Sequence, residues 1–224
     1  MKVKAKSSKV NRAWINDHVN DPYVKLAKLE CYRARAAYKL KEIDETLQLI
    51  KPGQLVVDLG STPGAWSQYV RRKMSPRTAA GGGAAVGELN GSIIALDLLP
   101  MEPVQGVVFL QGDIREPEVL QRLASEMHGR QADLVLSDMA PNLSGIAAAD
   151  AALIENLVEL ALEFAQGHMK VRGTLVVKVF HGAVYEQLVR RFRETFVVVK
   201  RIKPKASRDK SAETFLVGSG LKSS

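Results

Sequence analysis

Charged residues occur at the ends of apolar segments, where burying a charge would be costly. Asp97, Asp113 and Asp138 come late in the segments SIIALDLLP, GVVFLQGDI and ADLVLSDMAP. Lys178 lies inside a further segment, GTLVVKVF, with a valine on either side. An unpaired charge in an apolar core is expensive, whereas a carboxylate beside a lysine lowers the cost of burying both. The pattern predicts a pocket at the strand ends, with Lys178 and Asp138 as neighbours.

Each of these residues also has an ordinary structural explanation. Lys178 could extend outward from a strand end to solvent, although its flanking valines argue against this. Lys39 in RARAAYKLKEID and Glu213 in SAETFLV are two further ionisable candidates. Taken alone, Lys39 suits a solvated helix face and Glu213 an edge-strand charge. The ordered series of acids is what favours a functional site.

A glycine-rich turn, DLGSTPGAW, follows the first apolar segment. Gly60 and Gly64 would let the backbone approach a ligand. The turn does not fit the G-x-G-x-x-G fingerprint of dinucleotide sites and has no phosphate-binding lysine. Asp97 suits the two hydroxyls of a ribose, and Asp113 the edge of an adenine. These acids disfavour a phosphate-rich cofactor and favour S-adenosylmethionine (SAM), which carries a sulfonium and an amino group.

Basic residues gather toward the two ends of the chain. Residues 1–51 hold 12 Lys and Arg against 6 Asp and Glu, and residues 199–224 hold 7 against 2. The residues between them hold 13 against 16. Basic ends on a slightly acidic body predict a polyanionic partner, with nucleic acid favoured over a generic solubilising surface.

Several other classes of protein are disfavoured by composition. The single cysteine, Cys31, excludes an intrachain disulfide, and the four histidines show no metal-ligand spacing, so we expect no metal. No apolar run approaches the roughly 20 residues that span a bilayer, and MKVKAKSSKVNRAW lacks the apolar segment of a secretory signal. We expect a cytoplasmic protein and, with one candidate site, a monomer.

The elements that would position these residues alternate between strand and helix. Strands are expected at 55–60, 92–100, 106–114, 132–141, 173–180, 197–204 and 213–220, and helical patterns at 22–49, 65–74, 116–129, 151–169 and 182–196. This order predicts a mostly parallel seven-stranded α/β sheet with helices on both faces. Only KASRDKSA separates the last two apolar segments, which is too short for a parallel crossover, so a terminal antiparallel strand is expected.

The chain is expected to form one domain, residues 21–224, preceded by a basic flexible arm, residues 1–20. The Gly/Ala-rich stretch SPRTAAGGGAAVGELNG, residues 75–91, is expected to be a flexible surface loop without chemistry. In sheets of this kind, ligands bind at the carboxyl ends of the strands, where the acids and Lys178 are predicted to lie.

Seven stretches of the chain carry a family resemblance, and they follow the family's order over nearly the whole length. They are NRAW, RARAAYKLKEID, VVDLGSTPGAWSQYV, LDLLPMEPVQGVVFLQGD, SDMAPNLSG, VVKVF and SRDKSAETFLVGSG. With these stretches, the sequence resembles the FtsJ/RrmJ-type ribosomal RNA 2′-O-methyltransferases. STPGAW replaces the more usual AAPGGW, and the loop 75–91 is longer than expected, which puts that loop's role in doubt.

The resemblance implies a Rossmann-like SAM-dependent methyltransferase fold and a set of site residues. The implied catalytic tetrad is Lys39, Asp138, Lys178 and Glu213. The implied SAM contacts are Gly64, Trp66, Asp97, Asp113 and Asp138, beside the turn glycine Gly60. The implied reaction is 2′-O-methylation of a uridine ribose in large-subunit (23S) ribosomal RNA, within the assembled 50S subunit.

Two roles for Lys178 and several functions stay open. Free lysine has a pKa of about 10.4, so a base role needs a pKa lowered by burial or by Lys39. The alternative role is to orient the hydroxyl and stabilise developing charge. The alternative functions are 2′-O-methylation of transfer RNA or another RNA, and non-catalytic RNA binding. Base C5 methylation is disfavoured because Cys31 lies outside the strand-end motifs, and a dehydrogenase because G-x-G-x-x-G is missing. DMAPN lacks the second proline and the aromatic of base amino-methylating enzymes.

Overall fold

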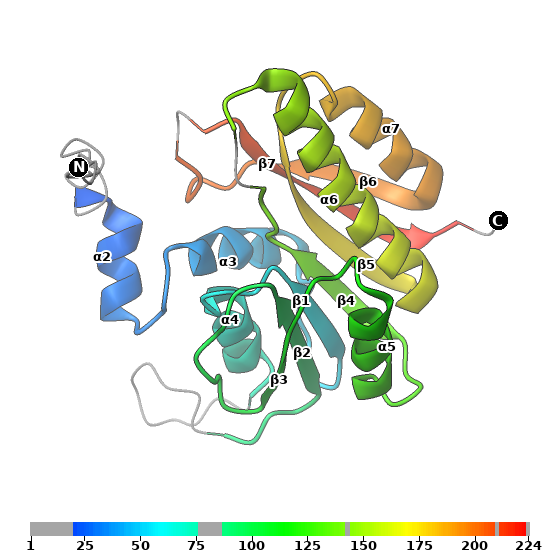
Figure 1. Ribbon diagram of the computed structural model, residues 1–224. Coiled ribbons are helices and arrows are strands. Elements are labelled where there is room, and N and C mark those ends of the chain that lie inside the picture. The colour runs from blue at the N-terminus through cyan, green and yellow to red at the C-terminus, as the bar shows by residue number, and fades with distance from the viewer. Residues whose placement is uncertain (1–19, 76–86, 142–143, 209–210, 223–224) are drawn as a thin grey trace, which may run out of the picture.

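The computed structural model describes residues 20–75, 87–141, 144–208 and 211–222, and these form a seven-stranded sheet between helices (Figure 1). The strands are β1 Leu55–Leu59, β2 Ser92–Asp97, β3 Val107–Gln111, β4 Ala132–Ser137, β5 Met169–Phe180, β6 Phe196–Ile202 and β7 Glu213–Leu221. Nearly all of the predicted arm 1–20 and most of the predicted loop 75–91 lie outside the described residues.

The strand order is β3-β2-β1-β4-β5-β7-β6. The first five strands pair in parallel, while β7 is antiparallel to both β5 and β6. The predicted mostly parallel sheet with a terminal antiparallel strand is therefore confirmed. β7 lies between β5 and β6. The last strand of the chain is therefore not at the edge of the sheet but beside β5.

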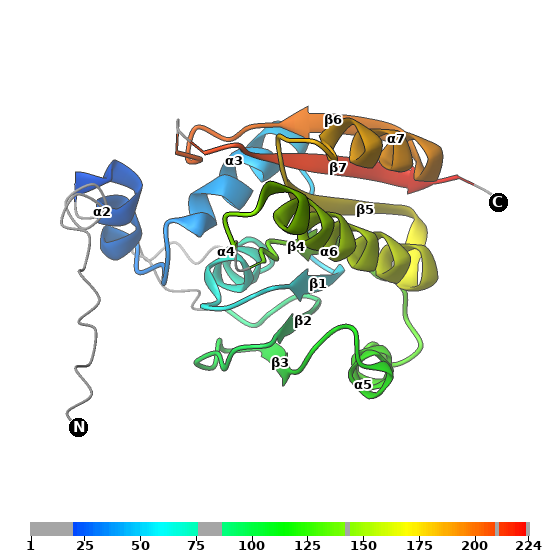
Figure 2. The same cartoon turned by 45° about the horizontal axis from the view of Figure 1, so that its top comes forward.

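Helices cover both faces of the sheet (Figure 2). They are α2 Pro22–Leu29, α3 Ala36–Leu47, α4 Ala65–Lys73, α5 Pro117–Glu126, α6 Ala147–His168 and α7 Tyr185–Thr195. Alternate strand residues point to opposite faces: in β1, Leu55 and Val57 belong to the core cluster on the face of α5, α6 and α7, whereas Val56 belongs to the cluster on the face of α3 and α4. Helix α2 stands to one side of these layers (Figure 1).

The helical pattern expected over 22–49 is two helices, not one. Asp21 caps α2 by accepting hydrogen bonds from the amides of Tyr23 and Val24. The helix ends at Leu29, and two residues later Cys31 has a φ of 57°, in the left-handed region that a continuing helix cannot use. Residues 30–35 form the break, so α2 and α3 point in different directions (Figure 1).

The expected boundaries around the fifth strand are also corrected. β5 begins at Met169 rather than residue 173, because Met169 pairs with Ala132 before a register shift. Met169 is buried, and a Cβ on Gly173 would lie 2.4 Å from its side chain, so only glycine fits this bend. Strands β2, β3 and β4 end earlier than expected, which leaves Asp113 and Asp138 in the turns that follow them.

Candidate active site

Two lysine–carboxylate pairs lie at the carboxyl ends of the central strands. Nζ of Lys178, on β5, lies 2.9 Å from Oδ1 of Asp138 and donates a 2.6 Å hydrogen bond to the main-chain oxygen of Asp138. Nζ of Lys39, on α3, lies 2.7 Å from Oε2 of Glu213, at the start of β7. The Lys178 and Glu213 side chains are only 8% and 9% exposed. Both predicted lysines are therefore paired, recessed groups rather than solvated surface charges.

The pairing of β5 with β7 brings the two pairs together. Glu213 faces Phe180 across the ladder, two positions from Lys178 on the same strand. The charge of Lys178 acts on the Glu213 carboxyl as well as on Asp138. All four residues of the predicted tetrad thus form one cluster, drawn from α3, β5, β7 and the turn after β4.

The Glu213 carboxylate is held by donors on both oxygens. Lys39 binds Oε2, and Oγ of Ser207 donates a 2.7 Å hydrogen bond to Oε1. Burial raises the pKa of Glu213, but the charge and hydrogen bond of Lys39, the Ser207 hydroxyl and the charge of Lys178 outweigh burial and lower it below its ordinary value. Glu213 is consequently a stable carboxylate partner for the two lysines at neutral pH.

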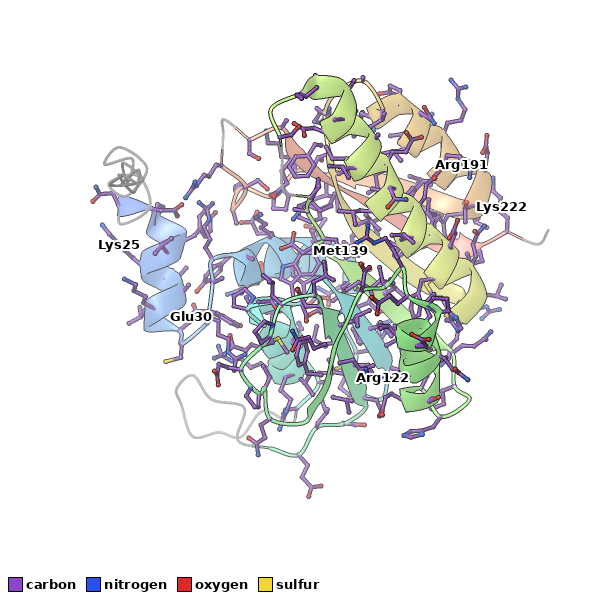
Figure 3. The ribbon with its side chains drawn as sticks, viewed as in Figure 1. Lys25, Glu30, Arg122, Met139, Arg191 and Lys222 are labelled. Atoms are coloured by element: carbon purple, nitrogen blue, oxygen red, sulfur yellow. The ribbon has the colours of Figure 1, made fainter. Side chains whose placement is uncertain are left out.

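A cavity of about 580 Å³ opens beside Asp138. It is lined by the ends of β1 and β2, by the turns after β3 and β4, and by α6. Gly60, Asp97, Asp113 and Asp138 all border it. Met139, labelled in Figure 3, also lines the cavity, just after Asp138. The volume falls in the range of small-molecule sites, and three of its walls carry a carboxylate.

Asp97 holds the loops around the cavity. Its Oδ2 accepts a 2.8 Å hydrogen bond from the amide of Thr62, and its Oδ1 accepts one of 2.8 Å from the amide of Leu99. A carboxylate has about four lone-pair sites, so two acceptor positions remain for the hydroxyls of a ribose. Asp97 therefore has a structural role in the loops, and its remaining acceptor positions are compatible with the predicted ligand role.

Asp113 forms a salt bridge with Arg115, two residues along the chain. Its two oxygens accept hydrogen bonds of 2.9 Å from Nε of Arg115, whose side chain is largely exposed. The hydrogen bonds from Arg115 hold the pKa of Asp113 below its ordinary value. Asp113 thus borders the cavity as a charged acceptor, and Arg115 lines the cavity beside it.

Both turn glycines have a backbone conformation that favours glycine, and at Gly60 close packing against the Met139 backbone requires it as well. Gly60 has φ 73°, and a Cβ there would lie 2.8 Å from the backbone nitrogen of Met139. Gly64 has φ 101°, and a Cβ there would lie 2.8 Å from Nη1 of Arg33. Arg33 donates to the carbonyl oxygens of Pro63, at 3.0 Å, and Pro103, at 2.8 Å, which joins the glycine turn to the segment after β2.

The Trp66 side chain does not line the cavity. Trp66 is 2% exposed, its indole donates a 2.8 Å hydrogen bond to the carbonyl oxygen of Ala36, and its ring packs against Phe215. Its backbone, at the start of α4, is the part of Trp66 that lies next to the turn. Gly64, the last residue of the turn before α4, is likewise not among the residues that line the cavity.

Buried polar atoms without partners lie at the end of β1. Asp58 is fully buried, and Ser67 donates a 2.7 Å hydrogen bond to its Oδ2, whereas Oδ1 of Asp58 and Oγ of Ser61 find no partner among the described residues. Burial raises the pKa of Asp58 to about 7, despite the Ser67 hydrogen bond and reinforced by Asp138 and Asp97. Unpaired buried carboxylates are costly.

These features fit SAM. The residues at the strand ends offer carboxylates and unpaired acceptors without an arranged set of cations for phosphates, and a cationic ligand would relieve the mutual repulsion of Asp58, Asp97 and Asp138. The sulfonium and ammonium groups of SAM supply such charge. The residues present could therefore hold this cofactor.

Two residues of the site were missed by sequence reasoning. Asp58 lies inside the apolar run LVVDL, the same signal that marked Lys178 in GTLVVKVF. Ser207 had no comparable signal, because a serine in a polar loop looks ordinary until the fold brings it to Glu213.

No group of three or more His, Cys, Asp or Glu suited to a metal ion occurs in the part of the chain that the structure describes. None of the described helices is long and apolar enough to cross a membrane.

Known proteins are similar to this chain in sequence and fold. A ribosomal RNA large subunit methyltransferase E from Albidiferax ferrireducens is 83% identical over 222 residues, covering 99% of each chain. The protein of the same name from Variovorax paradoxus is 68% identical over 99% of this chain and 98% of its own. A solved ribosomal RNA methyltransferase from Plasmodium falciparum superposes with a TM-score of 0.71 at 27% identity, over 85% of this chain and 98% of its own. The family model of FtsJ-like methyltransferases matches residues 32–221, and the chain belongs to that family.

Proposed function

We propose that this chain methylates the 2′-hydroxyl of a uridine ribose in large-subunit (23S) ribosomal RNA, using SAM, within the assembled 50S subunit in the cytoplasm. The observation that carries the proposal is the Lys178–Asp138 pair beside a carboxylate-lined cavity of cofactor size. The names of the relatives, ribosomal RNA large subunit methyltransferase E, support this class of substrate.

Lys178 is assigned to the reacting hydroxyl. When bound, SAM would supply an electrophilic methyl group. An ammonium has three N–H donors, and the hydrogen bond to the main-chain oxygen of Asp138 uses one of those of Lys178. Oδ1 of Asp138 lies 2.9 Å away as an ion-pair partner but accepts no hydrogen bond from the described residues. A donor therefore remains for a ribose oxygen, so Lys178 orients the hydroxyl toward the cofactor and stabilises the charge that develops on it. Asp138 borders both the cavity and Lys178, and it fixes their relative positions.

The Lys39–Glu213 pair is assigned to the ribose and its phosphate. Glu213 anchors Lys39 at 2.7 Å, and Ser207 anchors Glu213. A lysine held in this way supplies a fixed point charge for the RNA backbone beside the target hydroxyl. Holding two reactants in line supplies a large part of a methyl-transfer rate.

Described residues of the two basic regions of the chain contact each other beside this site. Arg35, just before α3, donates a hydrogen bond to the carbonyl oxygen of Ala206, in the segment between β6 and β7. That segment carries the exposed Lys203, Lys205 and Arg208. These described basic residues lie on the side of the site that carries Lys39, which supports binding of RNA phosphates there.

Labelled methyl transfer tests the proposal. Purified protein and SAM with a tritiated methyl group are supplied with undermethylated large subunits, deproteinised 23S RNA or transfer RNA. The product is hydrolysed with alkali, because a 2′-O-methyl group blocks strand cleavage and leaves a labelled dinucleotide. The expected result is labelled dinucleotide from large subunits, and much less from free RNA or transfer RNA.

Other outcomes identify the alternatives. Label in mononucleotides would mean base methylation and would overturn the ribose assignment. Preferential labelling of transfer RNA would establish the second candidate, another RNA 2′-O-methyltransferase. RNA binding without any label on any of the three substrates would indicate a non-catalytic RNA-binding protein.

A further inference from the structure

The segment before β7 is fastened to α3 by a side chain outside the tetrad. The Glu42 carboxylate accepts hydrogen bonds from the amides of Lys205, at 2.5 Å, and Ala206, at 3.0 Å. It also accepts one of 3.1 Å from the hydroxyl of Tyr23, on α2. Ala206 is completely buried and packs with Ala27 and Tyr38. This segment is therefore held in place by α2 and α3 together.

The fastened segment presents one hydroxyl to the tetrad. Ser207 follows Ala206, is 3% exposed, and its amide donates a 2.9 Å hydrogen bond to the carbonyl oxygen of Pro204. With the backbone fixed on both sides, Oγ of Ser207 lies 2.7 Å from Oε1 of Glu213. A buried serine hydroxyl bonded to a carboxylate is a charge-assisted contact, stronger than a neutral hydrogen bond.

We infer that Ser207 is a positioning residue for Glu213, and that Glu42 holds Ser207 in register. The inference rests on the proposed function, in which Glu213 anchors Lys39. Donors on both oxygens fix the plane of the Glu213 carboxylate. The Lys39 ammonium that is bonded to it is thereby held in a single position within the tetrad. Without Ser207, the carboxylate keeps Lys39 but can rotate about its side-chain bonds.

The pKa of Glu213 distinguishes a positioning role of Ser207 from a purely structural one. A purely structural role of Ser207 would leave this pKa unchanged. Three cations face this carboxyl: Lys39 on α3, Lys178 on β5, and Arg35 before α3. Burial opposes ionisation, and the Ser207 hydrogen bond favours the charged form. Removing the hydroxyl therefore raises the pKa of Glu213, and activity that needs the carboxylate is lost at a higher pH as the solution is acidified.

The experiment measures the single-turnover methyl-transfer rate against pH for wild type and Ser207→Ala at saturating SAM and RNA. We expect the acid limb of Ser207→Ala to move up by about one pH unit, with a lower rate at neutral pH and an unchanged dissociation constant for SAM. The matched control is Ser211→Ala, because the Ser211 hydroxyl accepts from the Glu213 amide, at 3.2 Å, and leaves the carboxylate untouched. Its acid limb should stay at the wild-type pH.

Two further measurements keep the inference falsifiable. Titration of the Glu213 carboxyl carbon by NMR, assigned with Glu213→Gln, should show a higher midpoint in Ser207→Ala without cofactor or RNA. Glu42→Gln, which retains the side-chain length, should shift both readouts in the same direction by less.

Unchanged midpoints and acid limbs, or a lower rate without any shift, would overturn the inference. If Ser207→Ala does not fold, Glu42→Gln decides the outcome by the same two readouts. Absence of methyl transfer by the wild-type protein would instead overturn the proposed function, and the carboxyl titration would still test Ser207.

Discussion

The ammonium of Lys178 contacts Asp138 twice, at 2.6 Å through the main-chain oxygen and at 2.9 Å through the carboxylate. The two residues belong to neighbouring elements, with Lys178 on β5 and Asp138 directly after β4. Asp138 also borders the cavity. In the proposed function, this contact would therefore set the distance between the bound cofactor and the lysine that acts on the hydroxyl.

Replacing Lys178 by methionine should reduce methyl transfer at least about 100-fold, since it removes the donor that orients the hydroxyl. SAM affinity in calorimetry should change little, because the carboxylates that line the cavity remain. Lys170→Met is the matched control: Lys170 is also on β5 and pairs with Asp133 at 2.6 Å, but it is half exposed. Near-normal activity of Lys178→Met would refute the assignment.

The arginine variant at position 178 separates the two roles of this lysine. A guanidinium stays charged and cannot accept a proton, yet it can still donate to a ribose oxygen. If Lys178 orients the hydroxyl, Lys178→Arg should retain more activity than Lys178→Met in single-turnover assays. Equal loss in the two variants would favour a base.

Lys39→Met and Glu213→Gln should each lower the methyl-transfer rate and leave the dissociation constant of SAM unchanged. Because the two side chains form one ion pair at 2.7 Å, the double variant should lose little more than either single variant. A double-mutant cycle of single-turnover rates measures this coupling. Fully additive losses would show that the two residues act separately.

Replacing Asp97 by alanine should weaken SAM binding at least about tenfold, because it removes the ribose acceptor and frees the amides of Thr62 and Leu99. The SAM affinity of Asp97→Asn, which keeps one acceptor oxygen, should lie between those of the wild type and Asp97→Ala. Calorimetry at pH 7 measures the affinities. Asp133→Ala serves as control, since Asp133 accepts a backbone amide at the opposite ends of the strands, and unchanged affinity of Asp97→Ala would contradict the ribose assignment.

Asp58 should make the cofactor-free protein less stable as the pH rises. Its pKa is raised to about 7, above the roughly 3.9 of an unfolded aspartate. Between these values the folded state binds a proton that the unfolded state has lost, so folding stability falls as the pH increases from about 4 to about 7. Asp58→Asn, which is neutral throughout, should raise the melting temperature more at pH 8 than at pH 5.

Asp44 provides the contrast for this prediction. Asp44 is equally buried, but it accepts hydrogen bonds from the amide of Ile50 and the hydroxyl of Tyr69 and pairs with Lys73. Asp44→Asn should therefore destabilise the protein at both pH values. A gain for Asp58→Asn that is the same at pH 5 and pH 8 would show that Asp58 does not titrate in this range.

Local patterns in the chain were enough to predict the class of fold and to single out Lys178 and the strand-end acids as candidates. Lys39 and Glu213 became favoured candidates, and Trp66 a candidate at all, only through the family resemblance. Apolar runs ended by acids mark strand ends, and a lysine between two valines marks a special position, because both signals depend only on adjacent residues. The short stretch between the last two strands fixed their antiparallel pairing for the same reason. The break at Cys31 was missed, since a left-handed residue depends on the packing of both flanking segments.

Contacts between distant segments were decided by the tertiary structure alone. The insertion of β7 beside β5 brings Glu213 to Lys39, 174 positions away in the chain, and the same packing turns the Trp66 side chain into the core. It also leaves Oδ1 of Asp58 without a partner among the described residues and aims Ser207 at Glu213. Strand order and register determine these distances, and both follow from the burial of two whole faces of the sheet rather than from any single motif.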